Sequence, residues 1–298
     1  MLRLSFPVGE VASVGAAVCW AVGLTMFRRD VQQIGARAVN LFKGVVACVA
    51  LALVTLVTGF PAMDSHTAGL LVLSGLVGLA LGDTLLFKAL GLLGPHRTSL
   101  FGVLGPIVTA SAGWMFLHEG LEPGQLVGVG LAVAGLALVV YFRGGHKDEP
   151  DIHLKGILYG AASALCQSAG TLLSRAAQTD IDALSGTTVR LFAASLGLVI
   201  YALCRRELGT QIRLLLDPAR LKRLILASLI GTFAGLWLMQ VGIKEAPAAV
   251  ANALHSTTPL FTLPIAVFYL KERLGRAAVF GSLAAVAGVA LLLLAGAS

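Results

Sequence analysis

Charged residues are scarce in this chain of 298 residues: Asp, Glu, Lys and Arg make up 12% of it. Soluble domains carry about twice that share. The hydrophobic fraction is 57% and the mean hydropathy is +0.88. So few charges cannot cover the surface of a water-soluble domain, so the composition excludes that class of protein.

Residues and motifs of several other classes are also missing. Only four cysteines occur, all inside apolar segments and without a Cys-x-x-Cys spacing, so we expect neither a disulfide framework nor a metal site. The sequence has no Gly-x-Ser-x-Gly, His-Glu-x-x-His or Walker lysine motif. We therefore expect no catalytic residues, no cofactor and no ATP-driven pumping.

Long apolar runs, by contrast, fill most of the chain. A helix of about 20 residues crosses the roughly 30 Å hydrocarbon core of a bilayer, whereas a barrel would show alternating segments of about ten residues. The sequence predicts an all-α polytopic membrane protein with ten transmembrane helices. The expected spans are 10–27, 38–58, 68–92, 98–117, 124–142, 156–173, 188–203, 224–243, 249–270 and 277–295.

The two halves of the chain resemble each other. Cys19, Gly23 and Arg28 recur 147 residues later, and a proline is followed by glutamate 13 residues on in both halves. We therefore predict a first five-helix repeat in 1–145, a linker in 146–155 and a second repeat in 156–298. The matched residues are Cys166, Gly170 and Arg175, and the pairs Pro106 with Glu119 and Pro259 with Glu272.

The odd number of helices in each repeat fixes their relative orientation. A second copy of a five-helix unit enters the membrane from the opposite side, so the repeats are inverted. Secondary transporters commonly have this construction, with the substrate site near the midplane. The sequence thus favours transport by alternating access.

Several motifs together resemble the drug/metabolite transporter superfamily, specifically its ten-span EamA-type branch. They are Cys19–Trp20 to Arg28, Gly82–Leu90, Arg190, Pro259, and Lys271–Leu274 before a Gly-rich last helix. The resemblance implies a central cavity lined by spans one, three, four, six, eight and nine. It also implies that spans five and ten are peripheral and that export of amino acids or related metabolites is the leading role.

An ionisable group within a span is costly and therefore a functional candidate. Asp83 is the deepest acid, so it is a candidate for binding a cation or a coupling proton. The alternative is a structural role, paired with Lys88 or bonded through Thr84. Lys43 and Arg190, near the starts of spans two and seven, are expected to snorkel or to form pairs.

The ninth span combines a histidine with a proline. Pro259 removes the hydrogen bond to the carbonyl of His255, and Pro106 does the same to Gly102 in the symmetric span four. We predict helix kinks at both prolines and place His255 in a polar cavity between spans four and nine. A histidine bonded to a neighbouring helix is the alternative.

Further polar and aromatic side chains concentrate in the proposed cavity helices. Trp20 lies at mid-depth of span one, and small polar residues recur along spans four, six, eight and nine. Such residues join helices about as often as they touch a ligand. The other candidate substrate-binding residues are Phe87, Thr98, Thr109, Gln167, Thr171, Trp237, Gln240, Asn252 and Ser256.

The basic residues predict the orientation in the membrane. Seventeen of the 22 Lys and Arg residues fall in odd-to-even connections and three on the other side, which explains the net charge of +7 without nucleic acid. We expect both termini outside, in the plasma (inner) membrane of a prokaryote. The expected partners are a small-molecule substrate, membrane lipid and a coupling proton, and the protein is expected to be a monomer or homodimer.

The function predicted from these features is secondary transport, with export of a small polar or amphipathic metabolite such as an amino acid. Two alternatives stay open. A flippase for a lipid-linked or amphipathic substrate predicts a cavity open sideways to the bilayer. A scaffold or sensor that transports nothing predicts that the polar cavity residues can be replaced without effect.

Overall fold

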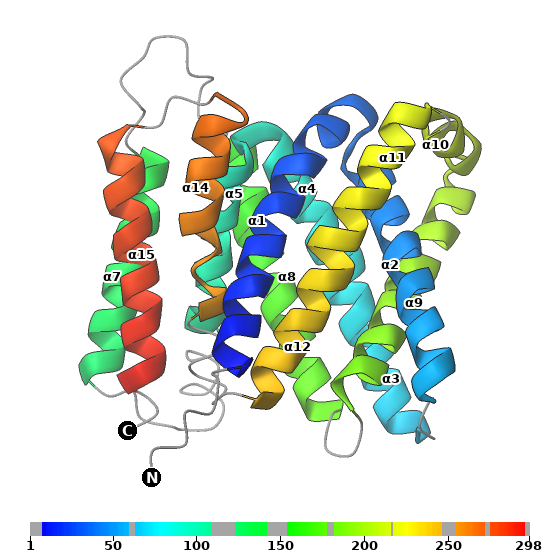
Figure 1. The fold of residues 1–298 in the computed structure, drawn as a ribbon, viewed down its shortest axis with the longest axis horizontal. Helices are drawn as coiled ribbons and strands as arrows, with labels where there is room; N and C mark the ends of the chain where they lie inside the picture. The colour runs from blue at the N-terminus through cyan, green and yellow to red at the C-terminus, as the bar shows by residue number, and fades with distance from the viewer. Residues whose placement is uncertain are drawn as a thin grey trace.

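The structure is a computed structural model that describes residues 8–59, 63–108, 123–141, 154–177, 182–215, 217–245, 254–271 and 275–295. Every regular element in these ranges is helical, which confirms the all-α prediction. The helices lie side by side in one bundle, with their axes roughly parallel or antiparallel to one another (Figure 1). Each predicted apolar run coincides with a helix, or with the described part of one.

The first half contains five spans. The third is continuous through three elements, and the fourth is described as far as residue 108. The elements are α1 (Val8–Ile34), α2 (Ala36–Thr58), α3 (Ser65–Ser74), the π-helical η1 (Gly75–Gly82), α4 (Asp83–Leu93), α5 (Pro95–Leu100), the 3₁₀ turn η2 (Phe101–Val103) and α7 (Pro123–Tyr141).

The second half repeats this order, with an added short helix before the eighth span. Its elements are α8 (Leu154–Ala177), α9 (Ala183–Cys204), α10 (Leu208–Leu215), α11 (Pro218–Ala227), the π-helical η3 (Ser228–Ala234), α12 (Gly235–Glu245), α14 (Thr258–Phe268) and α15 (Arg276–Ala295). Among the described residues, five helices are long and apolar enough to cross a membrane, and three shorter ones are apolar.

The two halves are inverted relative to each other. In Figure 1, α1 starts at the end of the bundle where α15 finishes, whereas α8 starts at the opposite end. The two-repeat helical architecture is that of a ten-span protein. Equivalent helices of the two halves therefore point in opposite directions, as the odd repeat requires.

Close glycine contacts hold the halves together at equivalent places. A Cβ on Gly23 of α1 would lie 2.6 Å from the Cα of Gly231 in η3. A Cβ on Gly170 of α8 would lie 2.8 Å from the Cα of Gly78 in η1. Gly170 follows Gly23 by 147 residues and Gly231 follows Gly78 by 153, so the same backbone contact occurs twice. Small residues allow such close approach in lipid.

Helices α7 and α15 form a separate pair at one edge of the bundle (Figure 1). They pack backbone to backbone: a Cβ on Gly135 would lie 2.4 Å from the backbone nitrogen of Ala285, and one on Gly288 would lie 2.3 Å from that of Ala132. This placement matches the peripheral position expected for spans five and ten.

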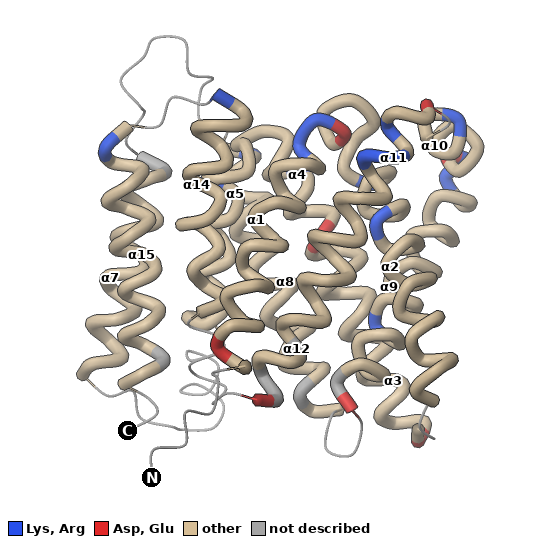
Figure 2. Tube along the Cα trace, in the orientation of Figure 1, with Lys and Arg blue, Asp and Glu red and all other residues tan. Residues whose placement is uncertain are grey.

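Charge separates the two ends of the bundle. Lys and Arg gather at the end that carries α10 and the start of α11, called here the basic end (Figure 2). At the opposite end, the side chain of Asp64 caps α3 by accepting the backbone N–H groups of His66 and Thr67. Hydrogen bonds from Thr67 lower the pKa of Asp64 below its ordinary value.

Helix α1 continues beyond the predicted span to Ile34. This extra length carries Asp30, which is fully buried. Arg223 of α11 donates to both carboxylate oxygens of Asp30, with 2.8 Å from Nε to Oδ2, and Arg220 lies 3.8 Å away. This ion pair between the two halves stabilises the polar last turns of α1, which the apolar pattern alone does not predict.

Candidate substrate site

The third and eighth spans are interrupted by π-helical segments at equivalent positions. Segment η1 starts at Gly75 and η3 at Ser228, 153 residues later. Both segments lie between two α-helical parts of one span. Such π-helical turns often occur at functional sites, because they release backbone groups from the regular ladder.

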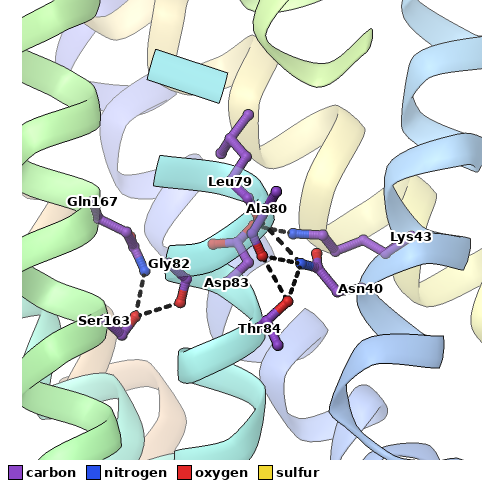
Figure 3. Close-up of polar contacts among 9 residues, drawn as sticks. All are labelled: Asn40, Lys43, Leu79, Ala80, Gly82, Asp83, Thr84, Ser163 and Gln167. Carbon is purple, nitrogen blue, oxygen red and sulfur yellow. Dashed lines mark hydrogen bonds and ion pairs between the residues drawn. The ribbon is translucent and has the colours of Figure 1, made fainter. Parts of the chain in front are cut away.

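Side chains from neighbouring helices bind the released carbonyl groups of η1 (Figure 3). The Asn40 amide on α2 donates to the carbonyls of Leu79 and Ala80 at 3.1 Å, and to the hydroxyl of Thr84 at 2.9 Å. From α8, Ser163 donates to the carbonyl of Gly82 at 2.8 Å. Unsatisfied backbone groups cost several kcal/mol in lipid, so these bonds stabilise the irregular segment.

Asp83 begins α4 directly after η1 and pairs with Lys43 of α2 (Figure 3). Only 5% of Asp83 and 7% of Lys43 are exposed. Lys43 donates a hydrogen bond to Oδ2 of Asp83. Among the described residues, this is the one hydrogen bond that the Asp83 carboxylate accepts. Lys88, the partner considered from the sequence, instead lies with Nζ 5.0 Å from the centre of the Tyr159 ring.

A pocket of about 50 Å³ lies against this ion pair. Its polar lining comes from Lys43, Asp83 and Thr232, and the rest is aromatic, aliphatic or glycine. The remaining lining residues are Trp20, Gly23, Leu24, Phe27, Leu79, Leu86, Phe87, Leu191, Gly231 and Leu236. The pocket therefore combines one ion pair with a largely apolar wall.

The helices around this pocket differ in part from those that the resemblance implied. Spans one, three and eight contribute as expected, but spans two and seven also line it through Lys43 and Leu191. Side chains of spans four, six and nine are not among its described lining. Helix α1 packs against η3 and α12 of span eight and against α4 of span three, and the pocket lies among these helices.

Arg190 of α9 lies close to the ion pair and 147 residues after Lys43. It approaches Asp83 closely enough for the two charges to interact, and its Nη2 lies 3.7 Å from where a Cβ on Gly78 would be. The Nε–H of Arg190 is buried and has no hydrogen-bond acceptor among the described residues.

His255 and Trp20 contact each other edge to face, with ring centres 5.1 Å apart. His255 Nδ1 and Trp20 Nε1 are both buried without a hydrogen-bond partner in the described ranges. The carbonyl of His255, expected to be free, accepts a hydrogen bond of 2.8 Å from the Thr258 hydroxyl. The freed acceptor is thus satisfied locally by the next turn.

The two prolines occupy different local structures. Pro259 lies in the first turn of α14, after a non-helical turn at 256–257, so the backbone is interrupted before the proline. Pro106 follows the 3₁₀ turn η2, which includes Gly102. The irregular backbone therefore lies next to both predicted kinks. Ser99 of α5 and Thr262 of α14 join spans four and nine through their hydroxyls at 2.8 Å.

The remaining candidates are dispersed. Thr98 and Ser256 are buried, Gln167 donates to Ser163 at 3.0 Å, and the hydroxyl of Thr171 donates to the carbonyl of Gln167 at 2.9 Å. Trp237 is 40% exposed and packs on Phe233. Gln240 belongs to α12, but its side chain is outside the described part, as are residues Thr109 and Asn252.

The part of the site that sequence reasoning missed is the role of Lys43 and Arg190 beside Asp83. The signal was present, because both are charged residues within apolar runs at equivalent places in the two repeats. In the described ranges, no group of three His, Cys, Asp or Glu side chains could hold a metal ion. The arrangement is suited to binding a ligand by charge and apolar contact.

Comparison with known proteins agrees with this architecture. The model of the EamA-like transporter family matches residues 7–141 and again residues 154–294. An uncharacterized transporter of Archaeoglobus fulgidus is 24% identical over 288 residues, which cover 95% of this chain and 96% of that protein. One solved crystal structure has a TM-score of 0.68 at 16% identity, covering 96% of this chain and 98% of the other, and shows the fold alone.

These matches cover nearly the whole chain, in two segments that correspond to the two halves of the bundle. The protein belongs to the EamA-like transporter family of the drug/metabolite transporter superfamily. It is thus an integral membrane transporter. Proposals for its substrate, its direction of transport and its mechanism have to come from the geometry of the site.

Proposed function

We propose that the protein is a secondary transporter, working as an exporter of a small polar or amphipathic metabolite such as an amino acid. In this proposal the halves alternate between two states around the pocket beside Lys43 and Asp83. The observation that carries it is this buried ion pair, which lines a pocket between helices of both repeats. A packed structural scaffold has no need for a costly charge pair at such a place.

The proposal extends to location and orientation. The plasma membrane of a prokaryote is the proposed site, with the basic end of the bundle facing the cytoplasm, because positive charge favours that side. Asp83 is the candidate for a coupling proton. A lipid flippase remains the second candidate, since the pocket wall is mostly apolar.

Alternating access can be tested without knowing the substrate. The four native cysteines are replaced by alanine, and Leu24→Cys places one thiol on the pocket wall. A membrane-impermeant maleimide is then applied to right-side-out and inside-out vesicles. We expect labelling from both sides, because a transporter exposes its pocket to each in turn, while a scaffold would leave Leu24→Cys unlabelled from at least one side.

Two controls complete the experiment. A thiol at an exposed position in the middle of α2, such as Val49→Cys, 56% exposed, controls for reagent that enters the bilayer. A variant that keeps only Cys204, which is exposed and ends α9 at the basic end, reports the orientation. Labelling of Cys204 from the extracellular side would contradict the proposed orientation while leaving alternating access open to the Leu24→Cys result.

A further inference from the structure

Helix α10 has no counterpart in the first half of the protein. In the second half, residues 205–217 separate α9 from α11 and contain this helix, whereas only residues 59–64 separate the equivalent α2 from α3. The shorter connection contains no Lys or Arg, and the longer one contains three arginines. The repeat therefore accounts neither for α10 nor for its charge.

Three basic residues on and beside α10 have no acidic partner. Arg206 precedes the helix, Arg213 lies in its last turn and Lys222 lies in α11, and all three are exposed. The ion pairs among the described residues include none of them. These three residues together with α10 are called here the α10 surface.

The acidic residues of the same connection are engaged elsewhere. Glu207 pairs with Arg37 at 3.3 Å and with Arg205 at 3.8 Å. Asp217 caps α11 by accepting the backbone N–H of Ala219 at 3.0 Å. The α10 surface therefore keeps an excess of positive charge, in the region of the basic end where Lys and Arg gather (Figure 2).

Helix α10 also exposes apolar side chains. Leu208, Ile212 and Leu215 recur at helical spacing. Leu215 packs on the apolar cluster that includes Phe27 and Phe87, but Ile212 is 50% exposed. The helix connects two segments that are long and apolar enough to cross a membrane, so it lies at the level of the bilayer surface. Apolar and basic side chains at this level are typical of a helix that lies among lipid headgroups.

One arginine links α10 to the contact between the two halves. Arg220 of α11 donates to the carbonyl of Leu214 in α10 and, at 3.2 Å, to the side-chain oxygen of Gln33 in α1. Its Nε lies 3.8 Å from Asp30, the acid that pairs with Arg223. A ligand that holds α10 in place therefore also supports the contact between α1 and α11.

We infer that the α10 surface binds the headgroups of anionic phospholipid. Basic side chains attract the phosphate groups, and the exposed Ile212 contacts the acyl chains beneath them. A soluble phosphate compound matches the charge but leaves the apolar side chain in water, so bilayer lipid is the occupant that matches both. The inference requires a membrane protein but no particular transported substrate.

Thermal unfolding of the purified protein in detergent tests the inference, because a ligand stabilises the state that it binds. The probes are phosphatidylglycerol and phosphatidylcholine with identical acyl chains, and glycerol 3-phosphate as a headgroup without chains. We expect a higher Tm with phosphatidylglycerol than with phosphatidylcholine, and no rise with glycerol 3-phosphate. High salt should reduce the difference between the two lipids, because it screens the charges.

A triple variant identifies the residues that bind. Arg206→Gln, Arg213→Gln and Lys222→Gln together should weaken the response to phosphatidylglycerol by about 100-fold, since each cation near an anionic surface contributes a factor of about five. In phosphatidylcholine the Tm of this variant should equal that of the parent, because the three side chains form no ion pair within the described protein. That equality shows that the variant folds.

The matched control removes the same number of charges from the basic end but spares α9, α10 and α11. Its exposed residues belong to α8, to the end of span nine and to α15, which stands at the opposite edge of the bundle from α10 (Figure 1). The substitutions are Lys155→Gln, Lys271→Gln and Arg276→Gln. We expect this control to keep the full response to phosphatidylglycerol.

Spin labels measure whether α10 touches the bilayer. On the cysteine-free protein, Ile212→Cys and Thr210→Cys carry the label on opposite faces of the helix, since residues two apart are about 200° apart around its axis. In vesicles of phosphatidylglycerol and phosphatidylcholine, we expect the label at 212 to meet dissolved oxygen more often than a water-soluble nickel chelate. The label at 210 should show the reverse.

Four results would overturn the inference. Equal Tm values in the two lipids would show that the headgroup charge is not recognised. A full rise with glycerol 3-phosphate would assign the surface to a soluble anion, and equal losses in the two triple variants would leave only diffuse attraction to the basic end. A label at 212 that meets the nickel chelate as readily as the label at 210 would place α10 away from the bilayer. None of these results bears on the Leu24→Cys test of alternating access.

Discussion

Buried charge is the feature that distinguishes this site at the scale of single residues. Asp83 and Lys43 are nearly inaccessible, and each is the other's nearest opposite charge. Removing one partner of such a pair leaves an uncompensated charge and typically costs about 3–5 kcal/mol, whereas neutralising both costs much less. This asymmetry can separate a structural role of the pair from a role in transport.

We predict that Asp83→Asn lowers the free energy of unfolding by about 3–5 kcal/mol, because Lys43 then lacks its anion. The double variant Lys43→Gln with Asp83→Asn should recover most of that loss. If the charges drive the change between the two transport states, neither variant should expose the pocket to both sides of the membrane in turn. The measurements are the Tm in detergent and two-sided labelling of Leu24→Cys. A double variant that alternates like the parent would assign the pair to stability alone.

The sequence was sufficient to single out Asp83 but not its partner. An acid inside an apolar run is conspicuous in a linear chain. Its neighbours in space are not, because spacing within one helix can only suggest Lys88 or Thr84. Lys43 lies 40 residues earlier on another span, and helix packing brings it to Asp83. The contact of Trp20 with His255 escaped prediction for the same reason.

At the scale of elements, the third and eighth spans depart from regular α-helix where they pack most closely. Segments η1 and η3 contain Gly78 and Gly231, each in backbone contact with a glycine of the other half. The close approach leaves no space for a side chain at these points. The glycine contacts therefore fix the distance between spans one and eight and between spans six and three.

We predict that Gly23→Ala destabilises the protein by about 1–3 kcal/mol, the usual cost of an added methyl group in a filled interior. The new Cβ would lie 2.6 Å from the Cα of Gly231, and backbone cannot move aside easily. Thermal unfolding in detergent measures the effect.

Gly130→Ala is the matched control for this substitution. Gly130 lies within α7 and has no atom within 4 Å of an added Cβ, so alanine there should be neutral or stabilising by up to about 1 kcal/mol. Equal Tm values for the two variants would refute the idea that the glycine contact sets the helix spacing.

The apolar runs predicted the helices well, since continuous hydrophobicity of this length has one solution in lipid. They could not predict the π-helical register, because it depends on which side chains of other helices bind the released carbonyls. The polar end of α1 was also missed. It owes its structure to a neighbouring helix, as the burial of Asp30 by Arg223 illustrates.

At the scale of the whole molecule, the halves meet at the basic end in two layers. The outer layer is the ion pair of Asp30 on α1 with Arg223 on α11, supported by Arg220. Beneath it, an apolar cluster lies between this pair and the pocket. The cluster includes Phe27 and Phe87, whose rings meet edge to face at 5.3 Å and which both line the pocket.

This ion pair has no symmetric counterpart. The positions equivalent to Asp30 and Arg223 are Ala177 on α8 and Leu70 on α3, neither of which carries a charge. An inverted repeat with identical ends would favour neither of its two states. The pair therefore biases the molecule towards the conformation in which the two halves are joined at the basic end, as they are in this structure.

We predict that Arg223→Gln opens the basic end more often. Arg220 stays near Asp30 at 3.8 Å, so the carboxylate keeps one cation and the fold is retained. Loss of about 1.4 kcal/mol from the closed state changes the ratio of the two states about tenfold. Labelling of Leu24→Cys from the basic side should then become about tenfold faster and labelling from the other side slower. Arg205→Gln, at the same end but 63% exposed, should change neither rate. Unchanged rates in Arg223→Gln would show that the apolar cluster alone closes this end, because the ion pair would then contribute equally to both states.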